Sequence, residues 1–415
     1  MRAPTGNTDS GTAIHASKGN TDIGTGVQAA TGAAGAQPRE GRLDSFGTTI
    51  FAEMSALALS TNSINLGQGF PDTDGPPEVL QAAARAIVEG RGNQYPPGPG
   101  IPELRRAISA HQRQQYGLDL DPDVEVLVTV GATEAIAAAI LGLTLPGDEV
   151  VMFEPYYDSY AATIALGGAR HRSVTLQPDG GRWSFEPDEL RRAITAQTRV
   201  ILLNSPHNPT GTVFNRAELT LIAELAREHD LIVVTDEVYE HLIFEGEHIP
   251  MATLPGMAAR TVTISSAGKT FSVTGWKVGG VSAPAPLLNR IRAVKQFLTY
   301  VGSGPFQYAI AEALEAATDY RAIAEQLRTR RDLFTKGLAE LGYSVHIPAA
   351  TYFATIDVGG QAEAWCRALP GRAGVVAIPS RVFYDSDIDR YVRFAFCKRP
   401  EVLAEALDRL GKMSA

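Results

Sequence analysis

Hydrophobic and polar positions follow two alternating periods along most of the chain. Between Pro77 and Ala311, short apolar runs typical of buried strands are separated by segments with the apolar period of helices, such as Thr133–Leu143 and Arg216–Glu228. This alternation predicts an α/β fold in which helices cover both faces of a mostly parallel sheet. The seven predicted strands are Val124–Val130, Glu149–Phe153, His171–Thr175, Arg199–Leu203, Leu231–Thr235, Thr261–Ser265 and Val278–Ser282.

The pattern changes in the last third of the chain, where strands and helices no longer alternate regularly. A long helical tract, Gln307–Leu341, is followed by short strands and a last helix near Pro400–Leu410, which together predict a smaller α+β part. A helix at Phe46–Leu59 and a short strand that starts at Ile64 are expected to complete this smaller part. Its other predicted strands are Tyr343–His346, Thr351–Asp357, Val375–Ile378 and Tyr391–Phe396.

Chain length favours a division into two domains. A single hydrophobic core stops growing near about 250–300 residues, and this chain has 415. We therefore expect a large domain over residues 72–302 and a small domain built from residues 43–71 with 303–415. Residues 1–42 are rich in Gly, Thr, Ala and Asn and contain almost no large apolar side chain, so they are predicted to form a disordered tail.

Composition excludes several classes of protein. The formal net charge of −9 offers no basic patch for nucleic acid or for an anionic membrane. Two cysteines, Cys366 and Cys397, make no disulfide framework, which favours a cytoplasmic location. The eight histidines lack the spacing of known zinc motifs, so no metal site is expected. Without a long apolar run or a signal-peptide core, we expect neither membrane insertion nor export.

Lysine is rare in this chain, and one lysine stands out by its position. Seven lysines occur in 415 residues, and Lys269 comes after the predicted strand Thr261–Ser265 in a Ser/Gly-rich turn. Open α/β sheets bind ligands at the carboxyl ends of their strands. A solvated loop lysine is the ordinary alternative, so the choice depends on the residues at the ends of the neighbouring strands.

Polar side chains also lie directly after two other predicted strands. Asn208 lies in the turn-rich segment after Arg199–Leu203, and Asp236 comes directly after Leu231–Thr235. Taken singly, Asn208 is explained as a turn former and Asp236 as a helix cap. Together with Lys269 they place an amide, a carboxylate and an amine at one edge of the sheet.

Four segments in order extend this set of polar residues. They are Asn208-Pro209-Thr210-Gly211, Thr235-Asp236-Glu237-Val238-Tyr239, Ser266-x-x-Lys269 with Gly275-Trp276-Lys277, and Tyr391-Val392-Arg393-Phe394. Over residues 43–412 the chain thereby resembles the class I/II aminotransferases, which have the pyridoxal-phosphate fold type I. Residues 65–72 (NLGQGFPD) and 93–100 (NQYPPGPG) are similar to one branch, which holds kynurenine/glutamine transaminases, methionine aminotransferases and N-succinyldiaminopimelate aminotransferases.

The resemblance implies an enzyme that uses pyridoxal 5'-phosphate (PLP). Lys269 would carry the cofactor as a Schiff base and then serve as general base. Asp236 would pair with the ring nitrogen and keep it protonated. Asn208 and Tyr239 would hydrogen-bond the phenolate oxygen of the ring, and Tyr157 would stack on its face. For Tyr157, ordinary core packing is the alternative.

The cofactor phosphate requires backbone N–H groups at a helix N-terminus, and the turn before the predicted helix Thr133–Leu143 offers them. By resemblance, Tyr95 would reach this phosphate from a partner subunit, which implies a homodimer with shared active sites. The predicted phosphate ligands of the chain itself are Gly131, Ala132, Thr133, Ser266 and Lys277.

The α-carboxylate of an amino-acid substrate calls for a planar fork of donors. By resemblance, Arg393 would bind this carboxylate, with help from Asn208 and from the backbone near Gly67. A strand arginine paired at the surface is the alternative. The resemblance implies transfer of the amino group of an amino acid to a 2-oxo acid.

Departures from the family pattern keep other reactions open. Gly280 stands where the family usually has a bulky aromatic residue, which would leave a void or room for a larger substrate. The segment Gly359–Arg372 is also unusual and falls where the small domain is expected to cover the site. The same residues support β- or γ-elimination, replacement or C–C bond formation, including on S-adenosylmethionine-like substrates. A PLP-binding regulator is a remote alternative, since residues 1–42 are too short and too polar for a DNA-binding domain.

Overall fold

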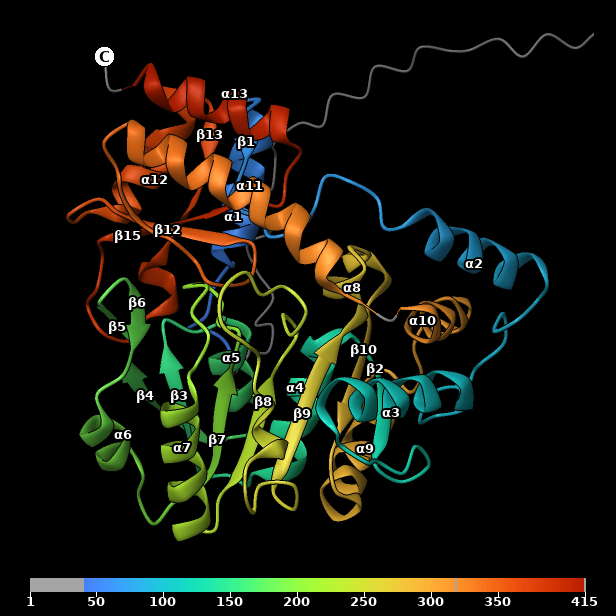
Figure 1. The fold of residues 1–415 in the computed structure, drawn as a ribbon. Coiled ribbons are helices and arrows are strands. Elements are labelled where there is room, and N and C mark those ends of the chain that lie inside the picture. Colours follow the sequence, from blue (N-terminus) through green and yellow to red (C-terminus); the bar gives the residue numbers. More distant parts are fainter. Residues whose placement is uncertain (1–40, 318, 414–415) are drawn as a thin grey trace, which may run out of the picture. The chain divides into compact units, whose positions relative to one another are not determined.

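Seven strands form one sheet in the computed structural model, which describes residues 41–317 and 319–413 (Figure 1). The strand β10 runs antiparallel to both of its neighbours, and the other neighbouring strands pair in parallel. All seven predicted strands are present, so the mostly parallel sheet is confirmed. In spatial order they are β2 (Val126–Val130), β10 (Val278–Ser282), β9 (Thr261–Ser266), β8 (Ile232–Asp236), β7 (Thr198–Asn204), β3 (Glu149–Glu154) and β4 (Arg170–Thr175).

The helices that accompany this sheet begin and end at residues suited to those positions. The helix α7 (Arg216–Glu228) starts with a capping box, in which Asn215 and Glu218 each accept the backbone amide of the other. The helix α3 (Pro102–Tyr116) ends at Gly117, whose left-handed φ of 71° suits glycine. The other helices are α2 (Pro77–Val88), α4 (Gly131–Leu143), α5 (Ser159–Leu166), α6 (Pro187–Ala193), α8 (Ala267–Thr270), α9 (Ala285–Leu298) and α10 (Gly304–Ala316), with short 3-10 helices η1 (Met251–Thr253) and η2 (Thr274–Trp276).

Alternate residues of the central strands are buried on opposite faces of the sheet. In β3, Val150 and Met152 belong to a core cluster with residues of α4, α5 and α9, whereas Val151 and Phe153 belong to a cluster with residues of α6 and α7. Because strand side chains alternate between faces, the nearly continuous apolar runs of the sequence reflect helices packed on both sides.

The last third of the chain builds a second, antiparallel sheet. Its strands, in spatial order, are β11 (Ser344–His346), β12 (Phe353–Asp357), β15 (Tyr391–Ala395) and β14 (Ile378–Pro379). A short parallel pair, β1 (Ile64–Asn65) with β13 (Val375–Val376), joins the N-terminal segment to it. The helices here are α1 (Ile50–Ser60), α11 (Arg321–Glu340), α12 (Ala362–Ala373) and α13 (Pro400–Gly411), with the 3-10 helix η3 (Ser380–Phe383).

One hydrophobic core joins the N-terminal segment to the last third of the chain. Met54 and Leu66 belong to the same buried cluster as Phe334, Phe394 and Leu410. On this basis we propose the two domains expected from the sequence, residues 72–302 and residues 43–71 with 303–415. From Arg42 onward the two parts pack as one compact unit.

Two elements of the last third differ from the sequence predictions. The predicted tract Gln307–Leu341 is two helices. The first, α10, ends where Ala317 takes up extended backbone, and α11 starts at Arg321, whose amide donates to the Asp319 carboxylate at 2.9 Å. The predicted strand Val375–Ile378 is divided between two sheets, since its first half pairs with β1 and Ile378 pairs with β15.

A small hairpin is absent from the predicted elements. The strands β5 (Gln177–Asp179) and β6 (Arg182–Ser184) pair antiparallel across Gly180 and Gly181, which both have positive φ. Asp-Gly-Gly between two short strands is the turn chemistry of such a hairpin, so the sequence contained the signal.

The predicted disordered tail lies, up to residue 40, outside the described residues. Among residues 41–317 and 319–413, no helix is both long enough and apolar enough to cross a lipid bilayer.

Candidate active site

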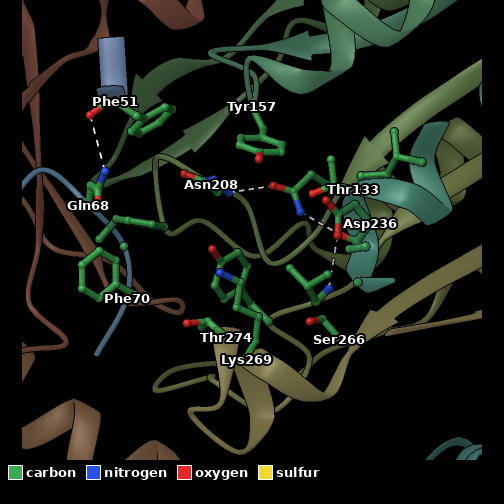
Figure 2. A pocket seen from close by; sticks show the side chains of 18 of the residues that line it. Phe51, Gln68, Phe70, Thr133, Tyr157, Asn208, Asp236, Ser266, Lys269 and Thr274 are labelled. Atoms are coloured by element: carbon green, nitrogen blue, oxygen red, sulfur yellow. Dashed lines mark hydrogen bonds between the residues drawn. The ribbon is translucent and has the colours of Figure 1, made fainter. Parts of the chain in front are cut away.

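A cavity of about 380 Å³ lies at the carboxyl ends of β7, β8 and β9 (Figure 2). This is the edge of the sheet at which the strand-end residues predict a ligand. The predicted site residues that the structure brings together in its lining are Gly131, Ala132, Thr133, Tyr157, Asn208, Asp236, Tyr239, Ser266, Lys269, Lys277 and Arg393.

Lys269 enters the cavity from α8, the single helical turn that comes after β9. Its Nζ donates a hydrogen bond to the Tyr352 hydroxyl at 2.8 Å, and that hydroxyl donates to the Gly69 carbonyl at 2.7 Å. Burial lowers the pKa of Lys269 to about 8, although Cys397 and Asp236 act in the opposite direction. A substantial fraction of the amine is therefore neutral and nucleophilic near neutral pH.

Asp236 is a buried carboxylate without a cationic partner in contact among the described residues. The Tyr160 hydroxyl donates to its Oδ2 at 2.6 Å, and the Val238 amide donates to its Oδ1 at 3.4 Å. Burial raises the pKa of Asp236 to about 6, even though these two hydrogen bonds favour the ionised form. A cation placed beside this carboxylate would hold it ionised.

Asn204 fixes the turn that carries Asn208. Its Nδ2 donates to the Asp236 carbonyl at 2.8 Å, and its Oδ1 accepts the Asn208 amide at 2.7 Å. The side-chain oxygen of Asn208 accepts a hydrogen bond from Arg393 Nη1 at 3.0 Å. The side-chain nitrogen of Asn208 is thereby left as a donor for a ligand oxygen.

Arg393, on β15, is 1% exposed and has no carboxylate partner among the described residues. Its Nη2 donates to the Gly67 carbonyl at 2.9 Å, and its buried Nε has no partner in that part of the chain. The guanidinium lies 4.1 Å from the ring centre of Phe353 and 5.1 Å from those of Phe51 and Phe383. Burial lowers its pKa to about 10, so it stays charged at neutral pH and requires an anion.

The opposite end of the cavity is built to hold an anion. The helix α4 begins at Gly131 without a side-chain cap, so its first amide groups are available to an anion. Gly131 has a φ of +70°, and a Cβ there would approach Lys277 Nζ to 3.4 Å, so glycine lets the cation come close. Ser266 lines the same cavity, and Lys277 has no carboxylate partner among the described residues.

The site thus combines an anion cradle, a carboxylate, an amine of lowered pKa and a buried guanidinium. Residues 61–410 match the family described as aminotransferase class I and II. The chain belongs to the class I and II aminotransferases. The family that the four sequence motifs indicated is therefore confirmed.

Known proteins resemble this aminotransferase over nearly its whole described length. It is 51% identical, over 389 residues, to the probable N-succinyldiaminopimelate aminotransferase DapC of Mycobacterium tuberculosis, with 90% of this chain and 98% of the relative covered. It is 39% identical, over 381 residues, to the methionine aminotransferase of Escherichia coli, with 90% and 98% covered. The solved structure of the N-succinyldiaminopimelate aminotransferase from Mycobacterium tuberculosis matches with a TM-score of 0.89 and 52% identity, covering 91% of this chain and all (100%) of that one.

These relationships confirm a PLP-dependent transferase of fold type I that transfers amino groups. The cavity fits this cofactor. An anion cradle stands ready for a phosphate, the unpaired Asp236 for a ring cation, and Lys269 for an aldehyde. The branch suggested by residues 65–72 and 93–100 is the branch of these relatives.

Three predicted tyrosines take different positions in this aminotransferase. Tyr157 and Lys269 lie on opposite sides of the cavity in Figure 2, and Tyr239 is buried in its wall. Tyr95 does not line the cavity; it is 82% exposed, and its ring contacts that of Tyr300 at 5.7 Å. A phosphate contact from Tyr95 of a partner subunit stays a prediction. Gly67 reaches the site through its carbonyl bond to Arg393.

The structure adds residues that the motifs do not indicate. Tyr160 bonds to Asp236, and Tyr352 bonds to Lys269. Tyr160 comes three residues after Tyr157, near the start of α5, and this closeness to a predicted site residue could have indicated it. No sequence pattern indicates Tyr352, because it lies just before β12, far from Lys269 along the chain. Further lining residues outside the predicted set are Phe51, Gln68, Gly69, Phe70, Ile136, Asn204, Val238, Thr274 and Phe353.

The interpretation of Gly280 as room for a larger substrate is wrong. Along β10, a Cβ at Gly279 would meet Gly131 at 2.8 Å, whereas one at Gly280 would meet Ile108 of α3 at 3.2 Å. Because successive side chains of a strand point to opposite faces, Gly280 faces away from the cavity at Lys269. It lines a separate cavity of about 40 Å³, so a void does exist there. One of the two observations that favour elimination or replacement chemistry, the other being the unusual N-terminal tail, is thereby removed.

The unusual segment Gly359–Arg372 does not line the cavity at Lys269 either. It contains most of α12, and its Glu363 and Arg367 line a neighbouring cavity that shares Phe51 and Tyr157 with the first. The expected cover over the site comes instead from Phe353, Arg393 and the segment Gln68–Phe70.

Proposed function

We propose that this aminotransferase holds PLP in the cavity at Lys269, with the residue roles that the family resemblance implies. When bound, PLP supplies an aldehyde that captures amino groups and a ring that withdraws electrons from the substrate α-carbon. The proposed ligands of its phosphate are the amides of Gly131, Ala132 and Thr133 with Ser266 and Lys277, and those of its ring are Asp236, Asn208, Tyr239 and Tyr157.

One observation supports amino-acid binding most strongly. Arg393 is a buried guanidinium that lacks a carboxylate partner among the described residues and has a free Nε. Burying a charge without a partner is costly, so the site is complete only when an anion arrives. The α-carboxylate of an amino acid matches the planar fork of donors.

Lys269 is proposed to move the proton of the reaction. With a pKa of about 8, its Nζ is able to take up the proton of the substrate α-carbon as a free base and to hold it as an ammonium. The hydrogen bond to Tyr352 restrains the amine between these two states. A base pKa near the working pH combines a usable neutral fraction with enough basicity.

Asp236 is proposed to keep a proton on the ring nitrogen. Burial makes its ionised form unfavourable when no cation is near, so this carboxylate gains strongly from a cationic partner. Tyr160 fixes the orientation of the carboxylate by donating to its Oδ2. The lone pairs that remain on the carboxylate are available to an N–H donor.

The cavity also indicates a class of amino acid. Arg393 is the only arginine that lines it in the part of the chain that the structure describes, so no second arginine of this chain awaits a side-chain carboxylate. Figure 2 shows Phe51, Gln68 and Phe70 at the end away from Thr133 and Ser266. We propose an extended amino acid whose side chain contacts this aromatic end. The names of relatives supply two candidates, and methionine fits this lining better than N-succinyldiaminopimelate, whose side chain carries carboxylates.

We further propose a cytoplasmic homodimer. Tyr95, Phe297 and Tyr300 are large apolar side chains that are 82%, 85% and 51% exposed, and Tyr95 and Tyr300 touch each other. Such a patch suits a protein interface, which supports the contact from Tyr95 to a partner's phosphate site. The two cysteines are free and buried, which agrees with a reducing compartment.

The substitution Arg393→Lys tests the proposal. A lysine keeps the charge but loses the fork, so the KM for the amino acid should rise about tenfold or more, the equivalent of about 1.4 kcal/mol or more. Arg331→Lys is the matched comparison, because Arg331 is also a buried guanidinium but pairs with Glu245 and Asp332 outside the cavity. If both variants bind amino acids like the wild type, Arg393 does not hold the substrate carboxylate.

A substrate screen tests the proposed class. Purified holoenzyme is given N-succinyldiaminopimelate, methionine, kynurenine or aspartate with 2-oxoglutarate, and the glutamate formed is measured. The extended amino acids should react with a higher kcat/KM than aspartate. A preference for aspartate would contradict the substrate class while leaving amino-group transfer intact.

A further inference from the structure

A second cavity, of about 40 Å³, lies beyond the wall of the first. It is enclosed by β10 and by the helices α3 and α10, and Ser266 lines both cavities. Gly280 opens this space, because a larger side chain there would extend toward Ile108 across it. A volume of this size is enough for a small ion or a water molecule, provided that polar groups surround it.

Two histidines meet at this cavity from distant parts of the sequence. His111 lies on α3, and His241 lies in the loop after β8. Their Nε2 atoms are 2.8 Å apart, and the two rings stand at 85° to each other. One nitrogen of each ring and one carboxylate oxygen of Glu240 lie within 4.8 Å of one another. Two imidazoles and a carboxylate are a common ligand set for Zn²⁺.

Glu240 places a negative charge beside these histidines. It is 7% exposed, and it accepts hydrogen bonds from Tyr116 and from Ser265, each at 2.7 Å. No lysine or arginine of the described residues contacts it. A buried carboxylate is costly to ionise without a cation beside it, so its surroundings favour a bound cation.

Gln112 adds a polar side chain to the wall of this cavity. It comes next to His111 on α3, is 2% exposed and lines the same cavity. Its side-chain oxygen is buried and has no hydrogen-bond partner among the described residues, although buried polar atoms are nearly always satisfied.

We propose that His111, His241 and Glu240 bind one divalent transition-metal ion of the Zn²⁺ class. The ion takes the place of the hydrogen that bridges the two histidines, and that proton moves from Nε2 to the Nδ1 of the same ring, so both Nε2 atoms offer a lone pair. For tetrahedral ligands about 2.0–2.1 Å from zinc, the two nitrogens separate to roughly 3.3 Å. The two nitrogens thus move apart by roughly 0.5 Å.

Such an ion would connect α3 to the loop after β8. That loop comes after Asp236 and Tyr239, so the metal would brace the segment that carries two proposed PLP ligands. His111 and His241 are 130 residues apart, so no spacing motif indicates them. The prediction of no metal site rests on the spacing of histidines along the sequence, which does not detect ligands that only the fold brings together.

The test is zinc binding by untagged holoenzyme that has first been treated with a chelator and dialysed. Zinc per chain is measured by mass spectrometry after equilibrium dialysis against Zn²⁺, and the melting temperature is followed. His241→Phe removes a ligand but keeps a ring to stack on Tyr320, 3.7 Å away. Glu240→Gln removes the charge at nearly constant shape. His229→Phe, at an exposed histidine, is the comparison.

The wild type and His229→Phe should bind one Zn²⁺ per chain and melt at a higher temperature with it. His241→Phe and Glu240→Gln should bind it at least about tenfold more weakly. If the wild type retains no zinc, or if both cavity variants retain it equally well, the site does not exist. Should His241→Phe fail to fold, Glu240→Gln alone decides between these outcomes.

Discussion

The Nζ of Lys269 donates a hydrogen bond of 2.8 Å to the hydroxyl of Tyr352. The two residues lie next to strands of different sheets, since Lys269 comes just after β9 and Tyr352 just before β12. The same hydroxyl donates to the Gly69 carbonyl, so the amine is held by a chain of two hydrogen bonds. The reactive amine is therefore oriented from the second sheet rather than from its own.

Replacing Tyr352 with phenylalanine should slow the reaction without abolishing it. The variant loses the acceptor of the Lys269 amine, worth about 1 kcal/mol, so kcat should fall about fivefold with little change in KM. Steady-state kinetics of Tyr352→Phe would show this. Tyr384→Phe is a fair comparison, because the buried Tyr384 hydroxyl has no partner among the described residues. Equal kinetics of the two variants would deny Tyr352 a positioning role.

Removing the charge of Asp236 should be far more damaging. In Asp236→Asn, the ring nitrogen loses its anionic partner, and breaking a buried ion pair costs about 3 kcal/mol or more. The value of kcat/KM should then fall about a hundredfold or more. Asp385→Asn serves as the comparison, since Asp385 also accepts a bond from a tyrosine but lies outside the cavity. An Asp236→Asn enzyme as active as Asp385→Asn would refute the role.

Lys269 should make the cofactor-free protein less stable at neutral than at alkaline pH. Burial places its folded-state pKa, about 8, below the ordinary 10.5. Its contribution to stability is therefore fully present above pH 10.5 and is lost as the pH falls through 8. Relative to Lys269→Met, the free energy of unfolding of the wild type should rise by about 2 kcal/mol from pH 7 to pH 10. Urea denaturation of both proteins measures this, and a constant difference would contradict the lowered pKa.

The shared active site can be tested by mixing two variants with complementary defects, at a PLP concentration too low to fill the Tyr95→Ala site. Lys269→Ala should lose the absorbance of bound PLP and all activity, and Tyr95→Ala should bind PLP more weakly. If Tyr95 serves the partner's site, a mixed dimer regains one complete site, and an equal mixture should recover about a quarter of wild-type activity. Subunits are exchanged by mild denaturation and refolding before the assay. Activity no higher than the mean of the two separate proteins would exclude a contribution across the interface.

The sequence was sufficient for the large sheet because its strands are buried on both faces and appear as separate apolar runs. It was weaker where tertiary pairing decides, as in Val375–Ile378, whose two halves join different sheets. The site residues likewise divide into those that local sequence indicates and those that only tertiary packing brings in. Lys269, Asp236 and Asn208 sit at strand ends and were indicated by position. Phe51 lines the cavity and Tyr352 bonds to Lys269 only through tertiary packing, which no local sequence pattern records.

The sequence was also a weak guide to which face of a strand carries a given side chain. Gly280 stood out because its residue type departs from the family pattern, but the type alone does not say which face of β10 it occupies. A Cβ at the neighbouring Gly279 would approach Gly131 on the opposite face of β10, because successive strand positions point to opposite faces.

The cavity at Lys269 draws its walls from Phe51 near one end of the chain and from Arg393 near the other. During synthesis the strands β7, β8 and β9 leave the ribosome long before β15 does. A nascent chain stopped before β15 would contain Lys269 and Asp236 but not Arg393, the guanidinium proposed to bind the substrate carboxylate. The lysine is therefore synthesised before the residue proposed to select its substrates, and the cavity is incomplete until β15 has been made.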